Sequence, residues 1–381
     1  MAPLYRSDLE SVRIVESLAA IEREEWNALA GPQPFVRHEF LSALIDTGCA
    51  AARSGWRPQF VLLYRSGALA GAMPLFAKSH SYGEYVFDWA WAEAHERHGI
   101  DYYPKLVGAI PFTPVKGARL LAASPEAKAT LLGAALELAR DASSLHVLFA
   151  RDEDARLLAD RGMLMRRTVQ FHWRNEGYAD FDDFLGRLSH ARRKNIRQER
   201  RRVAAAGVRL RRLEGAAIER RHWEFFNSCY RGTYAAHRST PYLSLEFFLR
   251  IGASMPDNVV MVIAERENRA IAASLLLRDA ESLYGRYWGA VEHVPLLHFE
   301  CCYYQAIEYA IEKKLTAFEG GAQGEHKLFR GLLPVEALSA HWLAHPKFAR
   351  AVESFLEREG AGIARYVNEL VEHSPFKEEA R

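Results

Sequence analysis

The sequence lacks several features that would define other classes of protein. It has 381 residues but only four cysteines, and none of them belongs to a C-x-x-C pair, so neither a zinc knuckle nor a thioredoxin-like centre is expected. No stretch of about 18 uncharged apolar residues is present, which argues against a transmembrane helix. The segment from Met1 to Glu25 holds no apolar run of the signal-peptide type. We therefore expect a cytoplasmic protein with reduced cysteines.

A large net charge is absent as well. Fifty Lys and Arg residues face 48 Asp and Glu residues, which leaves +2, so the chain as a whole is not a basic coat for nucleic acid. Because 49% of the residues are hydrophobic and 26% are charged, the chain can bury a sizeable core, which excludes a disordered or fibrous protein. At about 150 residues per domain, the length favours two domains.

One pattern of predicted elements occurs twice. Residues 59–76 and 259–277 each contain an apolar strand, a short polar turn and a second apolar strand, which predicts a β-hairpin. Residues 130–149 and 300–318 each indicate a helix that leads into a short strand. In the second helix the residues at the spacing of a buried stripe are Tyr303, Ile307, Ala310 and Ile311. The repeated order predicts duplication of one α/β unit, with chance similarity of common elements as the alternative.

We expect the boundary between two domains within residues 165–185, where a polar, turn-like segment follows an extended one. The predicted domains are residues 1–170 and 171–381. The first contains a long aromatic insert, 78–119. The second contains a basic helix, 189–206, and one or two amphipathic helices at its C-terminal end.

Positive charge is concentrated in one segment of the second predicted domain. Eleven basic residues lie between Arg187 and Arg212, and only Glu199 opposes them, so this segment is near +10 and the rest of the chain near −8. At helical spacing four arginines share a face: Arg193, Arg197, Arg200 and Arg201. Because Arg guanidinium groups suit phosphates, this face could dock tRNA, a nucleotide-linked substrate or a CoA moiety. The alternative is a solvated face that pairs with carboxylates from the other domain.

Long stretches of the sequence resemble one protein family. The segment LSHARRKNIRQERRRVAAAGVRLRRLEG resembles the part of Fem-type peptidoglycan aminoacyltransferases in which a basic helix leads into a Gly-Val strand. The segment AIEYAIEKKLTAFEGGAQGEHKLFRGLLP is similar to their helix, short strand, Gly-Gly and lysine. The pieces HSYGEYVFDWAWA, YYPKL, PFTPV and HFECCYYQAIEYAI resemble the FemAB-like branch of bacterial N-acyltransferases. The resemblance extends over most of the chain.

The resemblance implies an α/β fold with mixed sheets, arranged as two tandem GNAT-like domains. It also implies an N-acyltransferase of class EC 2.3, which transfers an acyl or aminoacyl group to a small-molecule or nucleotide-linked amine. The expected donor is aminoacyl-tRNA or acyl-CoA, used as a cosubstrate and held in a cleft between the domains, and no tightly bound cofactor is expected. CoA-using GNAT enzymes have a glycine-rich loop for pyrophosphate. The matching segment here, WGAVEHVP at 288–295, has one glycine, which favours an aminoacyl donor.

Acyl transfer to an amine needs a base, hydrogen-bond donors for the tetrahedral oxyanion, and a clamp for the anionic carrier. The segment EGGAQGEHKLFR, 319–330, offers all three directly after a predicted strand, although a plain surface turn is the alternative. The predicted catalytic residues are Glu325, His326, Lys327, Glu300 and Glu319. Glu300 is also explained as a carboxylate in the first turn of a helix.

The predicted substrate-binding residues come from three segments. They are His80, Glu84, Tyr103, Lys105 and Thr113 in the aromatic insert, Arg193 and Arg197 in the basic helix, and His298, Gln323 and Arg330 in the second domain. The insert alternates aromatic and polar residues, which suits either the wall of a cleft or a packed loop. His80 and Glu84 do not predict a metal site, because Gly83 lies between them and no third ligand is near.

Two other functions stay open. One is an acyl-CoA-dependent GNAT N-acetyltransferase that acts on a small-molecule amine. The other is a non-catalytic RNA-binding module, which would use the basic helix and bind with a steep salt dependence. The sequence also leaves open the acceptor amine, the acyl group, whether both domains have a working cleft, and the quaternary state.

Overall fold

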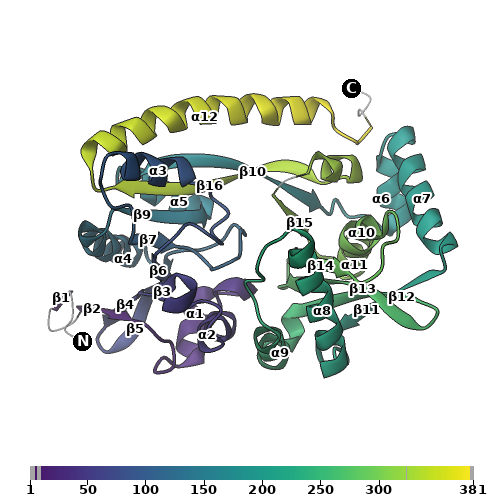
Figure 1. Cartoon of the computed structure of the whole chain (residues 1–381), viewed down its shortest axis with the longest axis horizontal. Coiled ribbons are helices and arrows are strands. Elements are labelled where there is room, and N and C mark those ends of the chain that lie inside the picture. The colour runs from purple at the N-terminus through teal and green to yellow at the C-terminus, as the bar shows by residue number, and fades with distance from the viewer. Residues whose placement is uncertain (1–4, 7–9, 323, 378–381) are drawn as a thin grey trace. The chain divides into compact units, whose positions relative to one another are not determined.

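The computed structural model describes residues 5–6, 10–322 and 324–377 (Figure 1). The chain divides into two compact units. Unit 1 comprises Met1–Thr168 and Glu336–Ala364, and unit 2 comprises Val169–Val335 and Arg365–Arg381. The polypeptide passes from one unit to the other within two strands and within the last helix.

The elements of unit 1 alternate between strands and helices. Its strands are β1 (Tyr5–Arg6), β2 (Glu10–Val15), β3 (Trp56–Pro58), β4 (Phe60–Arg65), β5 (Ala68–Met73), β6 (Leu75–Lys78), β7 (Lys105–Gly108), β8 (Leu121–Ala122) and β9 (Ser144–Ala150), with most of β16 (Leu333–Leu343). Its α-helices are α1 (Arg23–Ala30), α2 (His38–Asp46), α3 (Trp89–Arg97), α4 (Pro125–Leu138) and α5 (Asp152–Asp160). Short 3₁₀ turns span Pro34–Val36, Ala52–Ser54 and Ala139–Asp141.

The strands β4 and β5 form the first predicted hairpin. They pair antiparallel, and their turn contains Ser66 and Gly67, both with positive φ as a tight hairpin turn requires. The chain continues from β5 into β6, which pairs antiparallel with β7, and β7 runs parallel to β9. The helix α4 precedes β9 and packs on the hairpin, since Leu131 and Leu132 share a core cluster with Val61. The hairpin and the helix that leads into a strand are thus confirmed in this unit.

Unit 2 has longer strands. They are the second half of β10 (Leu164–Arg174), β11 (Val208–Glu214), β12 (Val259–Arg266), β13 (Arg269–Arg278), β14 (Ser282–Ala290) and β15 (Ala317–Ala322). The α-helices are α6 (Phe181–Arg187), α7 (His190–Ala205), α8 (Arg220–Ala236), α9 (Leu245–Ser254), α10 (Leu297–Phe299) and α11 (Gln305–Glu312), and α12 (Pro346–Glu372) ends in this unit. A π-helical turn spans Glu300–Tyr304, and 3₁₀ turns span Gly215–Ala217, Pro256–Asn258 and Glu325–Arg330.

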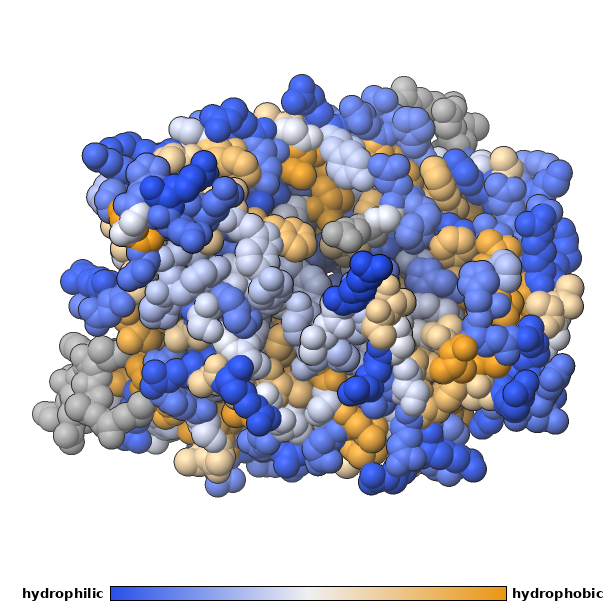
Figure 2. Space-filling view, in the orientation of Figure 1, coloured by the Kyte–Doolittle hydropathy of each residue, from blue (hydrophilic) through white to orange (hydrophobic). Residues whose placement is uncertain are grey.

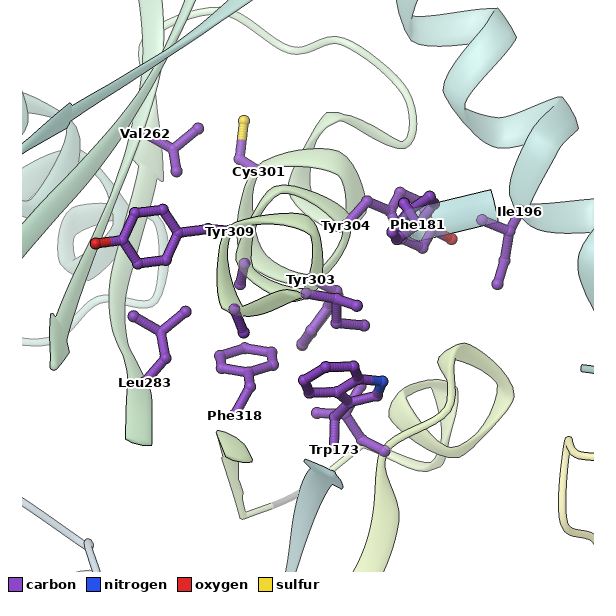
Figure 3. Packing of buried hydrophobic residues seen from close by; sticks show 14 of the residues in the cluster. Trp173, Phe181, Ile196, Val262, Leu283, Cys301, Tyr303, Tyr304, Tyr309 and Phe318 are labelled. Atoms are coloured by element: carbon purple, nitrogen blue, oxygen red, sulfur yellow. The ribbon is translucent and has the colours of Figure 1, made fainter. Parts of the chain in front are cut away.

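The strand order in unit 2 is β11–β12–β13–β14–β15–β10. All neighbours are antiparallel except β14 and β15, which are parallel. Strands β12 and β13 form the second predicted hairpin, which is confirmed. Alternate residues of β12, such as Val260 and Val262, pack in one core with Ile307 and Ala310 of α11. Figure 3 shows part of this core, with aromatic side chains from the α11 segment set against Phe318 of β15.

Both units use the same order of elements. In unit 1 it is β4, β5 with β6, β7, α4 and β9, and in unit 2 it is β12, β13, β14, α11 and β15. In each unit the last two strands of the series are parallel. This agreement supports the duplication inferred from the sequence. The strand that follows each series pairs in the other unit: residues 170–174 of β10 pair with β15, and residues 338–343 of β16 pair with β9.

The C-terminal region consists of one helix, α12, which follows β16. Residues 336–364 group with unit 1, whereas the sequence places the whole C-terminal region in the second domain. The reason is that β16 pairs with β9, and that Val352 and Leu356 of α12 pack in a cluster with Trp91. The predicted limits of the two domains stay a prediction. Within the described ranges no helix combines the length and the hydropathy needed to cross a membrane.

Candidate functional site

A cavity of about 120 Å³ lies in unit 2 where β14 and β15 separate. The two strands pair in parallel only over Ser282–Tyr284 and Ala317–Glu319. Beyond this point residues of both strands line the cavity, together with residues of β13 and of the segment before α11. The lining residues are Ser274, Leu275, Leu276, Gly285, Arg286, Tyr287, Trp288, His298, Cys302, Tyr303, Phe318 and Gly320. The separation of the strands therefore creates a pocket that is mainly apolar, with a few polar groups.

The π-helical turn before α11 carries two of the lining side chains, Cys302 and Tyr303. Turns of this kind are rare and are frequent at functional sites. The Tyr303 hydroxyl lies 3.1 Å from Nε2 of His326, and burial raises the pKa of Tyr303, so the phenol keeps its proton. Burial, followed by the charges of Arg330 and Lys327, lowers the pKa of His326. His326 is therefore an uncharged imidazole at neutral pH.

Lys327 is a buried cation beside this cavity. Its Nζ donates hydrogen bonds to the carbonyl oxygens of Ala322 at 2.7 Å and Gly321 at 3.3 Å. In the described part of the chain no carboxylate pairs with it. Burial lowers the pKa of Lys327 to about 8. Its charge acts on the thiol of Cys302, which lines the cavity. The ammonium group thus lies next to the cavity without a neutralising anion.

Among the described residues, His298 is the predicted site residue that lines the cavity. Burial, and then the charges of His326, Arg330 and Lys327, lowers its pKa to about 4. Arg330 is buried, and its guanidinium donates to both oxygens of Glu199, at 2.8 and 2.9 Å. The structure therefore brings four of the predicted residues together around one side of the cavity, and it pairs only Arg330 with a carboxylate.

Two other predicted residues of the segment 319–330, Glu325 and Glu319, are not among the described residues that line the cavity. Glu325 is exposed and accepts a hydrogen bond of 3.2 Å from the Tyr366 hydroxyl. Glu319 lies on β15, and its Oε2 is 3.8 Å from Nε2 of His172 on β10. Gln323 is outside the described residues. Neither carboxylate is among the residues that line the cavity.

Glu300 has a structural environment. It is buried, Arg200 donates to both of its oxygens at 3.1 and 3.2 Å, and Gln305 donates to Oε1 at 2.9 Å. Both oxygens of this carboxylate are thus held by side-chain donors of the protein itself. This geometry supports the alternative interpretation of Glu300 and not the catalytic one.

The basic helix predicted at 189–206 is α7. Its buried stripe consists of Ile196 and Val203, and Arg193 and Arg200 lie on the same side of the helix, where both are half-buried. Arg197 is four residues from Arg193 and three from Arg200, but it is exposed, because positions 193 and 200 flank the apolar stripe at spacings of three and four residues and Arg197 lies farther around the helix. The role of Arg193 and Arg197 in substrate binding stays a prediction.

The outward side of α7 carries the cations that remain exposed. Arg197 pairs with Asp182 at 2.8 Å, while Lys194, Arg201 and Arg202 are exposed and have no ion-pair partner among the described residues. Figure 2 shows hydrophilic residues over α7 at the right of the view. This side is the part of the basic segment that is available to an anionic ligand.

The predicted residues of unit 1 form a buried polar cluster. Lys105 is fully buried, and its Nζ donates to Glu84 at 2.9 Å, to Ser81 at 2.8 Å and also to Asp88. The Ser81 hydroxyl is 2.9 Å from that of Tyr103. Burial raises the pKa of Glu84 to about 7. Burial alone would raise the pKa of Asp88 as well, but the charge of Lys105 lowers it to about 2. Two carboxylates thus compensate one lysine.

Two further predicted residues of the insert lie outside this cluster. His80 is half-buried, and its Nδ1 accepts a hydrogen bond of 3.2 Å from the backbone N–H of Tyr82. Burial, followed by the charge of Lys78, lowers the pKa of His80. Thr113 is buried and donates to the carbonyl oxygen of Pro111 at 3.0 Å. The structure thus brings Glu84, Tyr103 and Lys105 together and leaves His80 and Thr113 outside the cluster. Contact of these residues with a substrate stays a prediction.

Sequence reasoning missed Cys302, Tyr303 and Trp288 as wall residues of the cavity. At helical spacing Tyr303 belongs to a buried stripe, and nothing in the sequence marks the π-helical turn that redirects it. The segment WGA at the end of β14 contains the one sequence signal near these residues, a glycine. A Cβ at Gly289 would lie 2.1 Å from the backbone oxygen of Cys229 in α8. Gly289 therefore serves close packing, which agrees with the absence of a phosphate loop there.

The described residues contain no group of three or more His, Cys, Asp and Glu side chains that could hold a metal ion.

Comparisons with known proteins agree with this architecture. The profile of the FemAB-like family, described as peptidoglycan biosynthesis/recognition, matches residues 17–378. The structure of FemX is similar, with a TM-score of 0.55 and 12% identity over 87% of this chain and 98% of that one. L-PGS from Bacillus licheniformis has a TM-score of 0.56 and 11% identity, over 90% of this chain and 99% of that one. No curated protein sequence matches the chain.

The structural likenesses confirm the predicted fold class, a mixed α/β protein with two GNAT-like domains. The family match covers nearly the whole chain and confirms the predicted enzyme class. The chain is thus a member of the FemAB-like family and an acyltransferase of the acyl- or aminoacyl-transferring type.

Proposed function

We propose that this protein is an N-acyltransferase whose reaction takes place at the cavity between β14 and β15. The nitrogen of an acceptor amine attacks the carbonyl carbon of a carrier-bound acyl or aminoacyl group. A C–N bond forms, the bond from that carbon to the carrier oxygen or sulfur breaks, and the proton lost by the amine ends on the leaving group. The protein must stabilise the oxyanion of the tetrahedral intermediate and move this proton.

The observation that carries this proposal is the state of Lys327. Its ammonium is buried beside the cavity, and among the described residues it donates hydrogen bonds only to backbone carbonyl oxygens. In a site of low dielectric, a preorganised cation is worth far more to a developing oxyanion than it is in water. Leaving a buried charge without a counter-ion is costly, so such an arrangement is typical of functional sites. We therefore assign to Lys327 the stabilisation of the oxyanion of the tetrahedral intermediate.

Proton transfer is assigned to the pair Tyr303 and His326. The Tyr303 hydroxyl lines the cavity and is 3.1 Å from Nε2 of His326, which is within hydrogen-bond reach. Because His326 is uncharged at neutral pH, it can accept the proton of the amine by way of the phenol and return it to the leaving group. Glu325 and Glu319, which the sequence also nominates, lie farther from the cavity wall, and a supporting role for them stays a prediction.

The donor carrier and the acceptor are proposed from chemistry and family. The outward side of α7, with Lys194, Arg201 and Arg202, suits the phosphates of aminoacyl-tRNA or of acyl-CoA. The family description, peptidoglycan biosynthesis/recognition, supports a peptidoglycan precursor as acceptor. We propose that this precursor is nucleotide-linked and has a free amine, and that the reaction takes place in the cytoplasm. The aromatic insert, through His80 and Tyr103, is proposed to contact this acceptor. The location of the acceptor in a cleft between the domains stays a prediction.

The test is acyl transfer to a uridine-diphosphate-linked muramoyl peptide with a lysine amine, from alanyl-tRNA or acetyl-CoA, followed by mass spectrometry of the peptide. Lys327→Ala should lower kcat by about 10²- to 10³-fold, the usual cost of losing an oxyanion-hole donor. Lys347→Ala, an exposed lysine in α12, is the matched control and should keep full activity. If Lys327→Ala keeps wild-type turnover, or if neither donor supports transfer while RNA binds tightly, the proposal fails.

A further inference from the structure

None of the described residues that line the cavity has a carboxylate. Seven of the twelve described residues that line it have a polar or charged side-chain group: Ser274, Arg286, Tyr287, Trp288, His298, Cys302 and Tyr303. Their hydroxyl and imidazole groups are neutral, and the guanidinium is positive. The apolar remainder comes mostly from Leu275, Leu276 and Phe318, with backbone supplied by two glycines. A ligand in this space therefore meets neutral and positive groups.

The charges just behind the wall are also positive. The low pKa of His298 has burial as its first cause and the charges of His326, Arg330 and Lys327 as the next ones. Arg330 is compensated by Glu199 at 2.8 Å, whereas Lys327 has only carbonyl oxygens as partners. Together with the Arg286 guanidinium in the wall, the Lys327 ammonium makes the charge around the cavity positive.

Nearby carboxylates do not change this balance. Glu319 follows Phe318 on β15, and because side chains alternate along a strand, it points to the other face of the sheet. Its Oε2 lies 3.8 Å from Nε2 of His172, and its side chain is not part of the cavity wall. Glu300 is taken up by the Arg200 guanidinium.

An α-aminoacyl group would bring a second positive charge into this space. An α-amino group has a pKa of about 8, so it is mostly protonated at pH 7. Within the cavity its ammonium would lose hydration, find no anion and face the charge of Lys327. An acyl group with a methyl or methylene in place of the ammonium would meet none of these costs and would bury apolar surface against leucine and phenylalanine side chains.

We infer that the cavity takes a small acyl group without a positive charge, so that the group transferred is an ordinary acyl group and not an α-aminoacyl group. This rests on the proposed function, since it names the substrate class of the same site. The volume sets the size: a cavity of about 150 Å³ holds benzene, so about 120 Å³ holds an acyl group of four or five non-hydrogen atoms.

A matched pair of amides tests this without any turnover. Isobutyramide and alaninamide have the same shape, and they differ in one methyl group against one ammonium. Their binding to the full-length protein is measured at pH 7 by saturation-transfer difference NMR. We expect isobutyramide to bind at least tenfold more tightly. Cys302→Phe, which fills the cavity from its own wall, should abolish binding of both amides, with circular dichroism to show that the variant is folded.

A second variant probes the cause. Lys327→Met removes the ammonium and should narrow the difference between the two amides. Equal or tighter binding of alaninamide, binding of neither amide, or binding unchanged in folded Cys302→Phe would each overturn the inference. These outcomes are distinct from failure of the proposed function, which is judged by transfer from alanyl-tRNA and acetyl-CoA. Transfer from alanyl-tRNA, with isobutyramide excluded from the cavity, would keep the enzyme and reject the acyl class.

Discussion

The two units place a buried lysine beside the parallel strand pair of the same repeated fold, but they surround it differently. In unit 1 Lys105, at the start of β7, donates to the carboxylates of Glu84 and Asp88. In unit 2 Lys327, which follows β15, donates only to backbone carbonyl oxygens. The first lysine is saturated by anions, whereas the second has an unneutralised charge next to a cavity.

This difference distinguishes a lysine that stabilises the fold from a lysine with a proposed chemical role in the same repeated fold. In unit 1 the buried lysine and its two carboxylates connect β7 to the segment that leads into α3. Because the charge of this lysine is already balanced, it contributes little to the binding of a ligand. A buried lysine without a counter-ion destabilises the resting protein and stabilises any negative charge that develops nearby. Two buried lysines at different positions of the repeated fold thus have different environments, and we place the proposed reaction in unit 2.

The largest expected effect is on the stability of unit 1. Lys105→Met leaves Glu84 and Asp88 buried next to each other without a cation, which should lower the free energy of unfolding by about 3–5 kcal/mol. Lys327→Met should cost far less or even stabilise the protein, because it removes a buried charge that has no counter-ion. Urea unfolding followed by circular dichroism measures both. A similar decrease in the free energy of unfolding of both variants would contradict the proposed difference between the units.

The second effect concerns Lys78, which is fully buried in unit 1 with its Nζ 3.8 Å from the centre of the Trp56 ring. Burial lowers its pKa to about 7, whereas the unfolded chain has a value of about 10.4. Between these values the unfolded state holds the proton and the folded state does not, so the stability contributed by Lys78 rises with pH. The advantage of Lys78→Met over wild type should shrink by about 1.4 kcal/mol per pH unit from pH 7 to 10. A difference that stays constant with pH would contradict the low pKa.

The third effect is the pH dependence of turnover. The pKa of Lys327 is lowered to about 8, so its ammonium, and with it the oxyanion partner, is lost as the pH rises through 8. We expect kcat to fall about tenfold per pH unit above that value. Lys327→Arg keeps its charge and should remove this alkaline limb, whatever its absolute rate. The profiles of the two proteins between pH 6 and 10 provide the measurement, and identical limbs would exclude Lys327 as the titrating group.

The smallest effect belongs to α7. Combined substitution of Lys194, Arg201 and Arg202 by alanine should weaken binding of an anionic carrier several-fold and reduce its salt dependence, while unfolding stays near wild type. Arg200→Ala should instead destabilise unit 2, because Arg200 is the partner of buried Glu300. Filter binding of tRNA at several salt concentrations distinguishes the two. If the triple-alanine variant keeps the wild-type dependence of tRNA affinity on salt concentration, the carrier does not bind at α7.

Much of the architecture could be predicted from the sequence, because hairpins and helix-to-strand transitions leave local periodic signals. The duplication, the hairpins β4–β5 and β12–β13, and the helix α7 were found in this way. The cavity could not be predicted, since it depends on where two parallel strands separate and on the π-helical turn that directs Tyr303. The charge state of Lys105 and Lys327 was equally hidden, because it is decided by partners distant in the sequence.

The central claim is that catalysis belongs to the uncompensated lysine and stability to the compensated one. The most direct measurement is kcat per folded molecule for Lys327→Met and Lys105→Met, taken side by side at one temperature with the folded fraction determined by circular dichroism. The account predicts a loss of about 100-fold or more for Lys327→Met and near wild-type turnover for the folded fraction of Lys105→Met. Full activity in Lys327→Met, or its loss in folded Lys105→Met, would contradict it.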